Sequence, residues 1–183
     1  ATPLTTLDHA QRFVRLDFDD EAIFLADPST SAGLLADSHR LGALGASAQM
    51  FGLMERSLEL AVAYTSEREA FGVPIGSFQA LQHRCADMLI QTESTRSATF
   101  RAAWAEETGT DDAPYLTSVA KAWAGPAGRF VCGQAIQLCG GVGFTWEYDP
   151  HIYLKRLKTL EQFHGSTTWH VENALAHAPV MKD

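Results

Sequence analysis

Two short stretches combine residue types that can hold an anionic ligand beside an aromatic ring. In the first, residues 68–79, an arginine and a phenylalanine precede a glycine, and a Phe-Gln pair follows. Arg68 offers a forked, charged donor for phosphate, Phe71 an apolar face and Gln79 a directional amide. The alternative is an ordinary turn, in which Gly72 reverses the chain and the arginine is solvated. These residues alone favour the turn.

The second stretch, residues 137–144, ends a helical pattern with a glutamine followed by three glycines and a phenylalanine. Beyond Gln137, the adjacent Gly140 and Gly141 let the backbone pass close to a ligand, and exposed amides there can cradle a phosphate. A glycine cluster is equally typical of a helix C-terminus. Taken alone, this stretch identifies no ligand.

Hydrophobic periodicity predicts the elements that position these stretches. A first helix carries an apolar stripe on one face, made of Leu41, Leu44, Ala48, Phe51, Leu58 and Val62. A second helix starts near Phe78 and ends before Gly109, with its stripe at Leu81, Cys85, Met88 and Thr92. A third runs from Pro114 to Cys139, with a kink or break expected at Pro126. The last is capped by Ser166 or Thr167 and ends near Ala176.

The N-terminal residues have a different pattern. Residues 10–17 and 22–25 resemble two short strands, and residues 27–31 have turn composition. Two short strands do not form a stable sheet alone, so they indicate the remnant of a larger β domain. We therefore predict a mainly α chain, in which residues 1–30 are the β remnant and residues 31–183 form an antiparallel four-helix bundle.

Composition limits the classes of partner. The 183 residues carry a formal net charge of −8 and no basic cluster, so we expect no nucleic-acid partner. The sequence contains neither a membrane-spanning apolar run nor a signal-peptide pattern, so no membrane partner is expected either. The three cysteines lie within helical patterns and indicate reduced thiols in a cytoplasmic protein.

Considered together, the arginine-phenylalanine-glycine turn running into Phe-Gln and the later Gln-x-x-Gly-Gly-x-Gly-Phe stretch resemble the C-terminal helical domain of bacterial FAD-dependent acyl-CoA dehydrogenases. The resemblance covers nearly the whole chain and implies that residues 1–30 are the tail of the family's middle β domain. It also implies that the bundle builds a tetramer core and contacts the FAD of a neighbouring subunit. The implied FAD contacts are Arg68, Phe71, Gln79, Gln137, Gly140 and Gly141.

The chain departs from the family pattern at the catalytic base. Most members carry an aromatic-Glu-Gly-Thr motif whose glutamate removes the α-proton of the acyl-CoA, and here residues 163–166 read Phe-His-Gly-Ser. A second group places its glutamate in the first bundle helix, but residues 39–43 contain no carboxylate. Glu55 lies further along that helix, on the order of 20 Å away at ~1.5 Å per residue. His164 is therefore the catalytic candidate.

The resemblance implies α,β-dehydrogenation of an acyl-CoA thioester. Histidine can accept a proton near neutral pH, but its reach differs from that of glutamate. We therefore expect His164 not to be a competent replacement, and the chain to be the half that lacks the usual glutamate. Its role would be that of a supporting subunit in a homo- or hetero-tetramer. The alternative function is a non-catalytic helical oligomerisation module.

Other polar groups are less informative. Glu161 and His164 have the Glu-x-x-His spacing of di-iron bundles, but no second pair exists, so we predict no metal site. The pairs Asp8-His9 and His170-x-Glu172 are expected to be ordinary surface groups.

Overall fold

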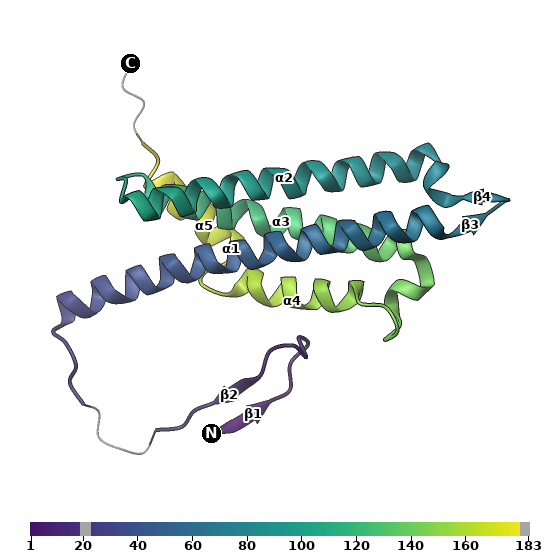
Figure 1. Cartoon of the computed structure of the whole chain (residues 1–183). Coiled ribbons are helices and arrows are strands. Elements are labelled where there is room, and N and C mark those ends of the chain that lie inside the picture. Colours follow the sequence, from purple (N-terminus) through teal and green to yellow (C-terminus); the bar gives the residue numbers. More distant parts are fainter. Residues whose placement is uncertain (19–22, 180–183) are drawn as a thin grey trace.

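The computed structural model describes residues 1–18 and 23–179 (Figure 1). Within this part of the chain, five α-helices account for most residues: α1 (Pro28–Glu67), α2 (Gln79–Thr108), α3 (Ala113–Cys139), α4 (Pro150–Gln162) and α5 (Thr167–Ala176). The strands form two small hairpins, β1 (Thr2–Leu4) with β2 (Phe13–Arg15), and β3 (Glu69–Ala70) with β4 (Val73–Pro74). Two 3-10 turns follow β4 and α3, namely η1 (Ile75–Ser77) and η2 (Gly140–Phe144). The predicted mainly α fold is confirmed.

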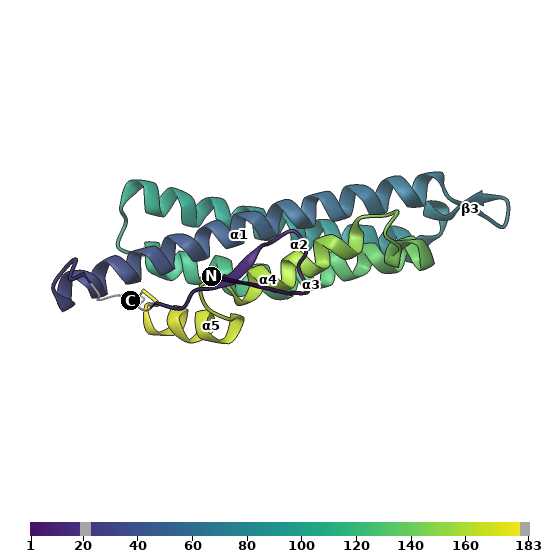
Figure 2. The ribbon, with the colours of Figure 1, turned by 90° about the horizontal axis from the view of Figure 1, so that it is seen from below.

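Successive helices from α1 to α4 run antiparallel along the length of the molecule, and the short α5 packs beside α3 (Figures 1 and 2). Helix α3 is central, because it packs against all four other helices. The fourth bundle helix is α4, which the sequence did not predict, and the expected last helix is the short fifth one. Its N-cap is Ser166, as expected, whose hydroxyl accepts from the Trp169 N–H.

The core of α1 is made of small and flexible side chains rather than the predicted stripe. The fully buried positions are Ala43, Ala46, Ser47, Met50, Met54, Ser57, Ala61 and Thr65. Leu41 and Val62, by contrast, are 53% and 43% exposed. Leu44, Phe51 and Leu58 are half-buried, so the predicted stripe lies along the edge of the buried face. The periodicity of large residues does not say which positions pack fully inward. Small residues suit the inner face, since they let α1 approach α3 closely.

The predicted stripe of α2 is largely correct, because Met88 and Thr92 are buried and Leu81 and Cys85 are half-buried. Helix α3 continues without a break through Pro126. The break expected there is therefore wrong, and the kink stays a prediction.

The N-terminal segment forms a hairpin with Thr2 opposite Arg15 and Leu4 opposite Phe13. The expected strand over 22–25 is wrong for residues 23–25, which form no strand, and Ala22 lies outside the described residues. Helix α1 begins within the stretch expected to be a turn: Asp27 is its N-cap, and its carboxylate accepts from the N–H groups of Ser29 and Thr30.

Asp8 is not a surface group as expected, because it is 1% exposed and pairs with Arg156 at 3.2 Å. This ion pair ties the hairpin to α4.

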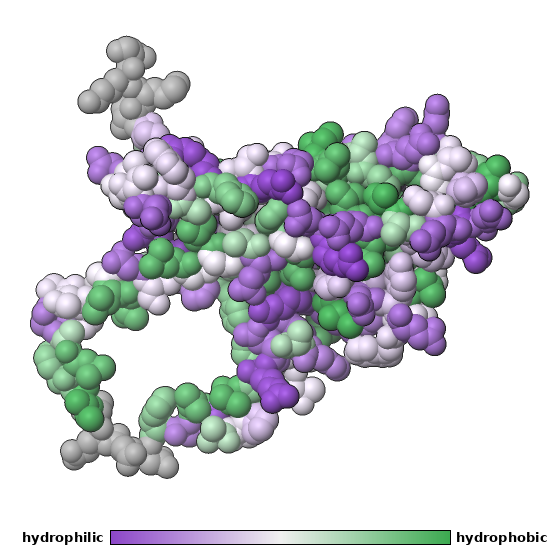
Figure 3. All heavy atoms as spheres, viewed as in Figure 1, coloured by the Kyte–Doolittle hydropathy of each residue, from purple (hydrophilic) through white to green (hydrophobic). Residues whose placement is uncertain are grey.

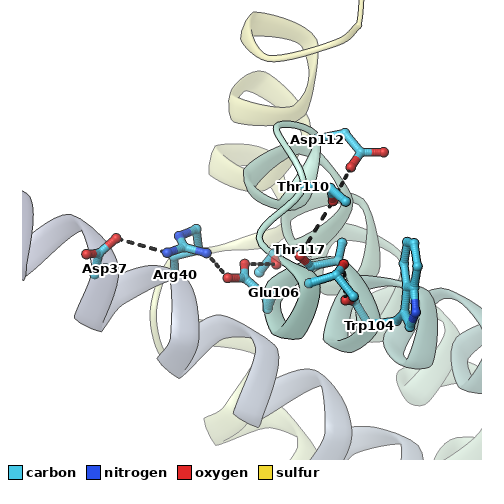
Figure 4. A network of polar contacts seen from close by, with 9 residues as sticks. Asp37, Arg40, Trp104, Glu106, Thr110, Asp112 and Thr117 are labelled. Carbon is cyan, nitrogen blue, oxygen red and sulfur yellow. Dashed lines mark hydrogen bonds and ion pairs between the residues drawn. The ribbon is translucent and has the colours of Figure 1, made fainter.

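An ion-pair network joins the first three helices near one end of the bundle (Figure 4). Arg40 on α1 pairs with Glu106 on α2 and with Asp37. Glu106 also accepts from the Thr117 hydroxyl on α3 at 2.9 Å. These contacts fix the register of α1 against α2 and α3 beside His39.

Large apolar side chains remain on the surface. Green atoms at the left edge of Figure 3 mark the segment at 23–25 and the start of α1. Ile23, Phe24 and Leu25 are 78–91% exposed, and Leu34 and Leu35 are 62% and 70% exposed. Exposed apolar patches of this kind are typical of surfaces that pack against another domain or subunit.

Candidate functional site

The first motif folds into a tight hairpin at one end of the bundle. Glu69 pairs with Pro74 and Ala70 with Val73, which leaves Phe71 and Gly72 as the two turn residues. Both have positive φ, +56° and +79°, as a type I′ hairpin turn requires. A phenylalanine is unusual at positive φ. Its ring is 95% exposed and lies edge-on to Phe78 at 6.3 Å.

Arg68 and Gln79 flank this hairpin. Arg68 is the C-cap of α1, with its N–H bonded to the Tyr64 carbonyl at 2.9 Å and its side chain exposed. Gln79 is the first residue of α2, and no side chain caps the N–H groups there. An uncapped helix N-terminus beside an arginine attracts anions, because free N–H groups and the helix dipole both favour negative charge.

The second motif ends α3 at the same end of the molecule. Gly143 is buried, and a Cβ there would lie 2.8 Å from the Ile136 carbonyl oxygen, so packing requires glycine. Gly141 faces open space within the described chain, without a positive φ. Nothing inside this chain therefore requires glycine at 141, whereas a ligand lying against the backbone would.

Figures 1 and 2 show the β3–β4 hairpin and the end of α3 at the same end of the bundle. At this end, Arg84 on α2 donates a hydrogen bond of 3.1 Å to Gln134 on α3, so α2 and α3 are joined there. Among the described residues, the side chains of Arg68, Gln79 and Gln137 make no hydrogen bond or ion pair. The structure thus brings the six predicted cofactor contacts to one end (Figure 1), where all six are exposed.

His164 lies far from this end, in the turn between α4 and α5. Its φ of +54° is in the left-handed region, and Gly165 follows at +99°. A Cβ at residue 165 would lie 2.8 Å from the Trp169 ring. The turn is therefore both conformationally strained and tightly packed.

Two buried side chains hold the backbone of this turn. Lys121 on α3 donates from Nζ to the Glu161 carbonyl at 2.9 Å and to the Gly165 carbonyl at 3.1 Å. His170 on α5 donates from Nε2 to the His164 carbonyl at 2.7 Å. A carbonyl only accepts, so the proton of neutral His170 is on Nε2, and Nδ1 has no partner among the described residues.

The His164 ring lies against α1 at Gly42, since a Cβ at residue 42 would lie 2.3–2.5 Å from three ring atoms. The His39 ring is 5.8 Å from that of His164 and 4.7 Å from Trp169. The two stretches where the family places its glutamate, 39–43 and 163–166, therefore meet in space. Both carry histidine. His39 and His170 also line a cavity of about 480 Å³ between α1, α3 and α5.

Burial lowers the pKa of three side chains around the His164 turn, namely His170, Lys121 and His39. It lowers the pKa of His170 from 6.5 to about 4, and that of Lys121 from 10.5 to about 8. Burial also lowers the pKa of His39, and the nearby His164 and Lys121 add to the effect. His170 is therefore neutral at physiological pH, which suits its role as a hydrogen-bond donor.

Sequence reasoning missed two members of the cluster. His170 was predicted to be a surface group and is 1% exposed, so that prediction is wrong. Lys121 is equally buried, and its only signal is a single charge within the apolar run Val119–Ala124. Among residues 1–18 and 23–179, no three His, Cys, Asp or Glu side chains are grouped to hold a metal ion. No helix of the described part is long and apolar enough to cross a membrane.

The described chain is an α-helical bundle with an exposed arginine turn and a glycine-rich turn at one end, and a loop between its last two helices (Figure 1). A family model described as acyl-CoA dehydrogenase, C-terminal domain, matches residues 38–178. The chain belongs to the acyl-CoA dehydrogenase family.

Individual relatives agree. The acyl-CoA dehydrogenase IpdE2 of Mycobacterium tuberculosis is 36% identical over 159 residues, covering 85% of this chain and 45% of that protein. The structure of PigA with FAD and proline matches with a TM-score of 0.73 at 27% identity, over 76% of this chain and 36% of that one. The acyl-CoA dehydrogenase of Geobacillus kaustophilus has a TM-score of 0.88 over 98% of this chain and 48% of that one, and its 20% identity supports the fold alone. This chain spans less than half the length of each.

Proposed function

We propose that this chain is the C-terminal half of an FAD-dependent acyl-CoA dehydrogenase subunit that lacks the family's usual catalytic glutamate. The proposed reaction is α,β-dehydrogenation of an acyl-CoA thioester within a homo- or hetero-tetramer. Family membership supports the reaction class. The proposal of an FAD site is supported by one observation: the arginine turn and the glycine-rich turn lie at the same end of the bundle (Figure 1).

The residues at that end fit a dinucleotide such as FAD. The two negative charges of a pyrophosphate match the guanidinium of Arg68 and the uncapped N-terminus of α2. The open backbone at Gly141 gives room for close approach. Phe71 and Phe78 offer apolar ring surface beside these polar groups. When bound, FAD would supply the acceptor for the hydride from the β-carbon.

The separation of the two sites supports binding of a neighbour's cofactor. Gly42, which contacts His164, and Arg68 lie 26 positions apart on α1. At ~1.5 Å per residue this is about 39 Å along the helix. One flavin whose reactive ring lies near position 164 would not extend to Arg68 of the same chain. The six predicted FAD contacts, which we call the clamp residues, therefore belong with the FAD of another subunit. The proposed function then requires an oligomer.

The proton acceptor has two possible sources within this proposal. It is either His164 or a carboxylate supplied by an unlike partner subunit. The sequence favours the partner, because imidazole and carboxylate differ in reach.

Flavin retention tests the clamp. In the full-length assembly, Arg68→Ala and Gly141→Ala should each weaken FAD binding at least tenfold, which corresponds to about 1.4 kcal/mol or more of binding free energy, and so lower the FAD content of the purified protein. Neither change removes an internal contact, so the far-UV circular dichroism should stay unchanged. The measurement is flavin absorbance per mole of purified protein.

Gly133→Ala serves as the control, since Gly133 lies on α3 and also faces open space. Its FAD content should equal that of the wild type. Undiminished FAD in both clamp variants would contradict the proposal. That result would favour the alternative function, a non-catalytic oligomerisation module. The exposed apolar residues of α1 are consistent with that alternative, because they suit packing against another subunit.

A further inference from the structure

The end of α4 receives an unusual set of donors. Carbonyl groups in the last turn of a helix have no partner within that helix. Here the carbonyls of Glu161, His164 and Gly165 accept hydrogen bonds of 2.7–3.1 Å from Lys121 and His170. Both donors are 1% exposed and come from other helices. The backbone of the turn is thus fixed from inside the fold.

What these donors hold is a strained conformation. A residue with a side chain at φ +54° is disfavoured, and such outliers persist only where the surroundings impose them. Glycine at 164 would adopt the same backbone without strain. His170 bonds to the carbonyl of this histidine, and Lys121 bonds to the carbonyls of Glu161 and Gly165 in the same turn. A histidine at this φ, in a turn held by two buried side chains, points to a use for the imidazole itself.

The His164 ring also lies in a gap on α1 that the glycine at position 42 leaves open, and we call this gap its seat. It contacts α1 where residue 42 has no side chain, and even one methyl group would lie 2.3 Å from its Cε1 atom. Gly45, one turn further along α1, faces open space. Gly42 therefore makes room for the imidazole, whereas Gly45 has no comparable neighbour.

We propose that His164 is the proton acceptor of this dehydrogenase, and that Lys121 and His170 are the positioning residues that hold it on its seat at Gly42. This inference rests on the proposed function and decides between its two sources of the base. His164 takes the α-proton onto a ring nitrogen. The electron pair of that C–H bond would form the Cα=Cβ double bond, and FAD, when bound, would supply the acceptor for the hydride that leaves the β-carbon.

A double-mutant cycle in the full-length FAD-loaded assembly tests the positioning. His170→Phe keeps the ring shape but removes the donor, whereas His170→Gln keeps an N–H at the same place. We expect His170→Phe to lower kcat about 10- to 100-fold with little change in KM, because a small displacement of a reacting group has a large effect on rate. His170→Gln should restore most of the kcat.

The cycle closes on His164→Ala. If His170 acts through His164, adding His170→Phe to His164→Ala causes no further loss of kcat. If the double variant instead loses kcat by the product of the two single-variant losses, the positioning role of His170 is overturned. Unchanged turnover in His164→Ala would overturn the catalytic role of His164, while the flavin content of the same preparation would still report on the proposed function.

A second measurement does not depend on turnover. Diethyl pyrocarbonate modification, followed by mass spectrometry at each histidine, reports how freely an imidazole is reached. In the full-length protein, His164 should react several times faster in Gly42→Ala and His170→Phe than in the wild type. His83, which is exposed on α2, should react at one rate in all of them.

Gly45→Ala is the matched control for Gly42→Ala, since both changes favour the helix equally. It should leave the reactivity of His164 at the wild-type value. Equal His164 reactivity in wild type, Gly42→Ala and His170→Phe would overturn the proposed seat and its two holding residues, whatever the activity of the enzyme.

Discussion

His170 is a buried neutral imidazole whose single N–H is committed to a backbone carbonyl. Its folded pKa of about 4 lies below the ordinary 6.5. Between these values the unfolded chain binds more protons than the folded chain, so lowering the pH favours unfolding. The stabilisation is fully present above pH 6.5 and is lost as the pH falls through 4. Lys121, His39 and His164 face the same imidazole, and their positive charge acts in the same direction.

We therefore predict that the free energy of unfolding falls between pH 6.5 and pH 4, and that His170→Phe makes this fall shallower. The variant should be less stable at neutral pH by about 1–2 kcal/mol, because the His164 carbonyl loses its donor. Urea unfolding at a series of pH values measures both effects. His83→Gln should keep the wild-type slope, and an equally steep slope in His170→Phe would contradict the assignment.

Between elements, α3 approaches α4 closely at Gly128. Gly128 is buried, and a Cβ on it would lie 2.3 Å from Leu157 Cδ1. Leu157 belongs to the hydrophobic cluster that also contains Met50 and Cys132. A larger residue at 128 would therefore push α4 away from the core that it closes.

Gly128→Ala should destabilise the protein by about 1–3 kcal/mol, because overpacking outweighs the better helix propensity of alanine. Gly133→Ala on the same helix should be neutral or slightly stabilising, because its Cβ would meet nothing within 4 Å. Thermal unfolding of the two variants in parallel provides the comparison. A Gly128→Ala protein as stable as Gly133→Ala would show that α4 shifts without cost.

The elements differ in how well their sequences predict them. Caps and breakers are local, so Ser166 before α5 and Gly109 after α2 were predicted correctly. Helix α4 was missed because its 13 residues mix charged and apolar side chains between two glycine-containing turns. The predicted inner face of α1 was only partly right, because Leu58 packs against the core whereas Leu41 is exposed. Which stripe is buried depends on the neighbours of the helix, and these are not encoded locally.

For the candidate site, sequence motifs named the proposed clamp residues and position 164. Spacing alone did not bring 39–43 and 163–166 together, because that contact depends on how α4 returns along α1. Lys121 and His170 were missed for the same reason, since their hydrogen bonds reach 40 or more positions along the chain or across a helix boundary. Such tertiary contacts become visible only in the folded chain.

At the scale of the assembly, the proposal places the clamp and the base of one active site on different subunits. Arg68→Ala and His164→Ala assemblies should each be inactive alone. When the two variants are co-expressed, sites that combine an intact His164 with a neighbour's intact Arg68 should form. Random mixing predicts recovery of about a quarter of wild-type activity. Activity is measured on purified mixed assemblies that carry a different tag on each variant.

The control mixes two variants of one function, Arg68→Ala with Gly141→Ala, and should stay inactive because every pairing lacks a clamp residue. No recovery in the Arg68→Ala and His164→Ala mixture, despite mass spectrometry showing mixed assemblies, would mean that each chain clamps its own flavin.

The hairpin tip has a consequence for the life of the chain before assembly. Phe71 is almost fully exposed on a two-residue turn, and proteolytic nicking concentrates at exposed loop tips. Until a neighbour covers it, a newly made chain presents a recognisable cleavage point at the end that its partner needs. Degradation would then remove orphan chains selectively, and the balance between subunits would be kept by the lifetime of the unassembled chain rather than by its rate of synthesis.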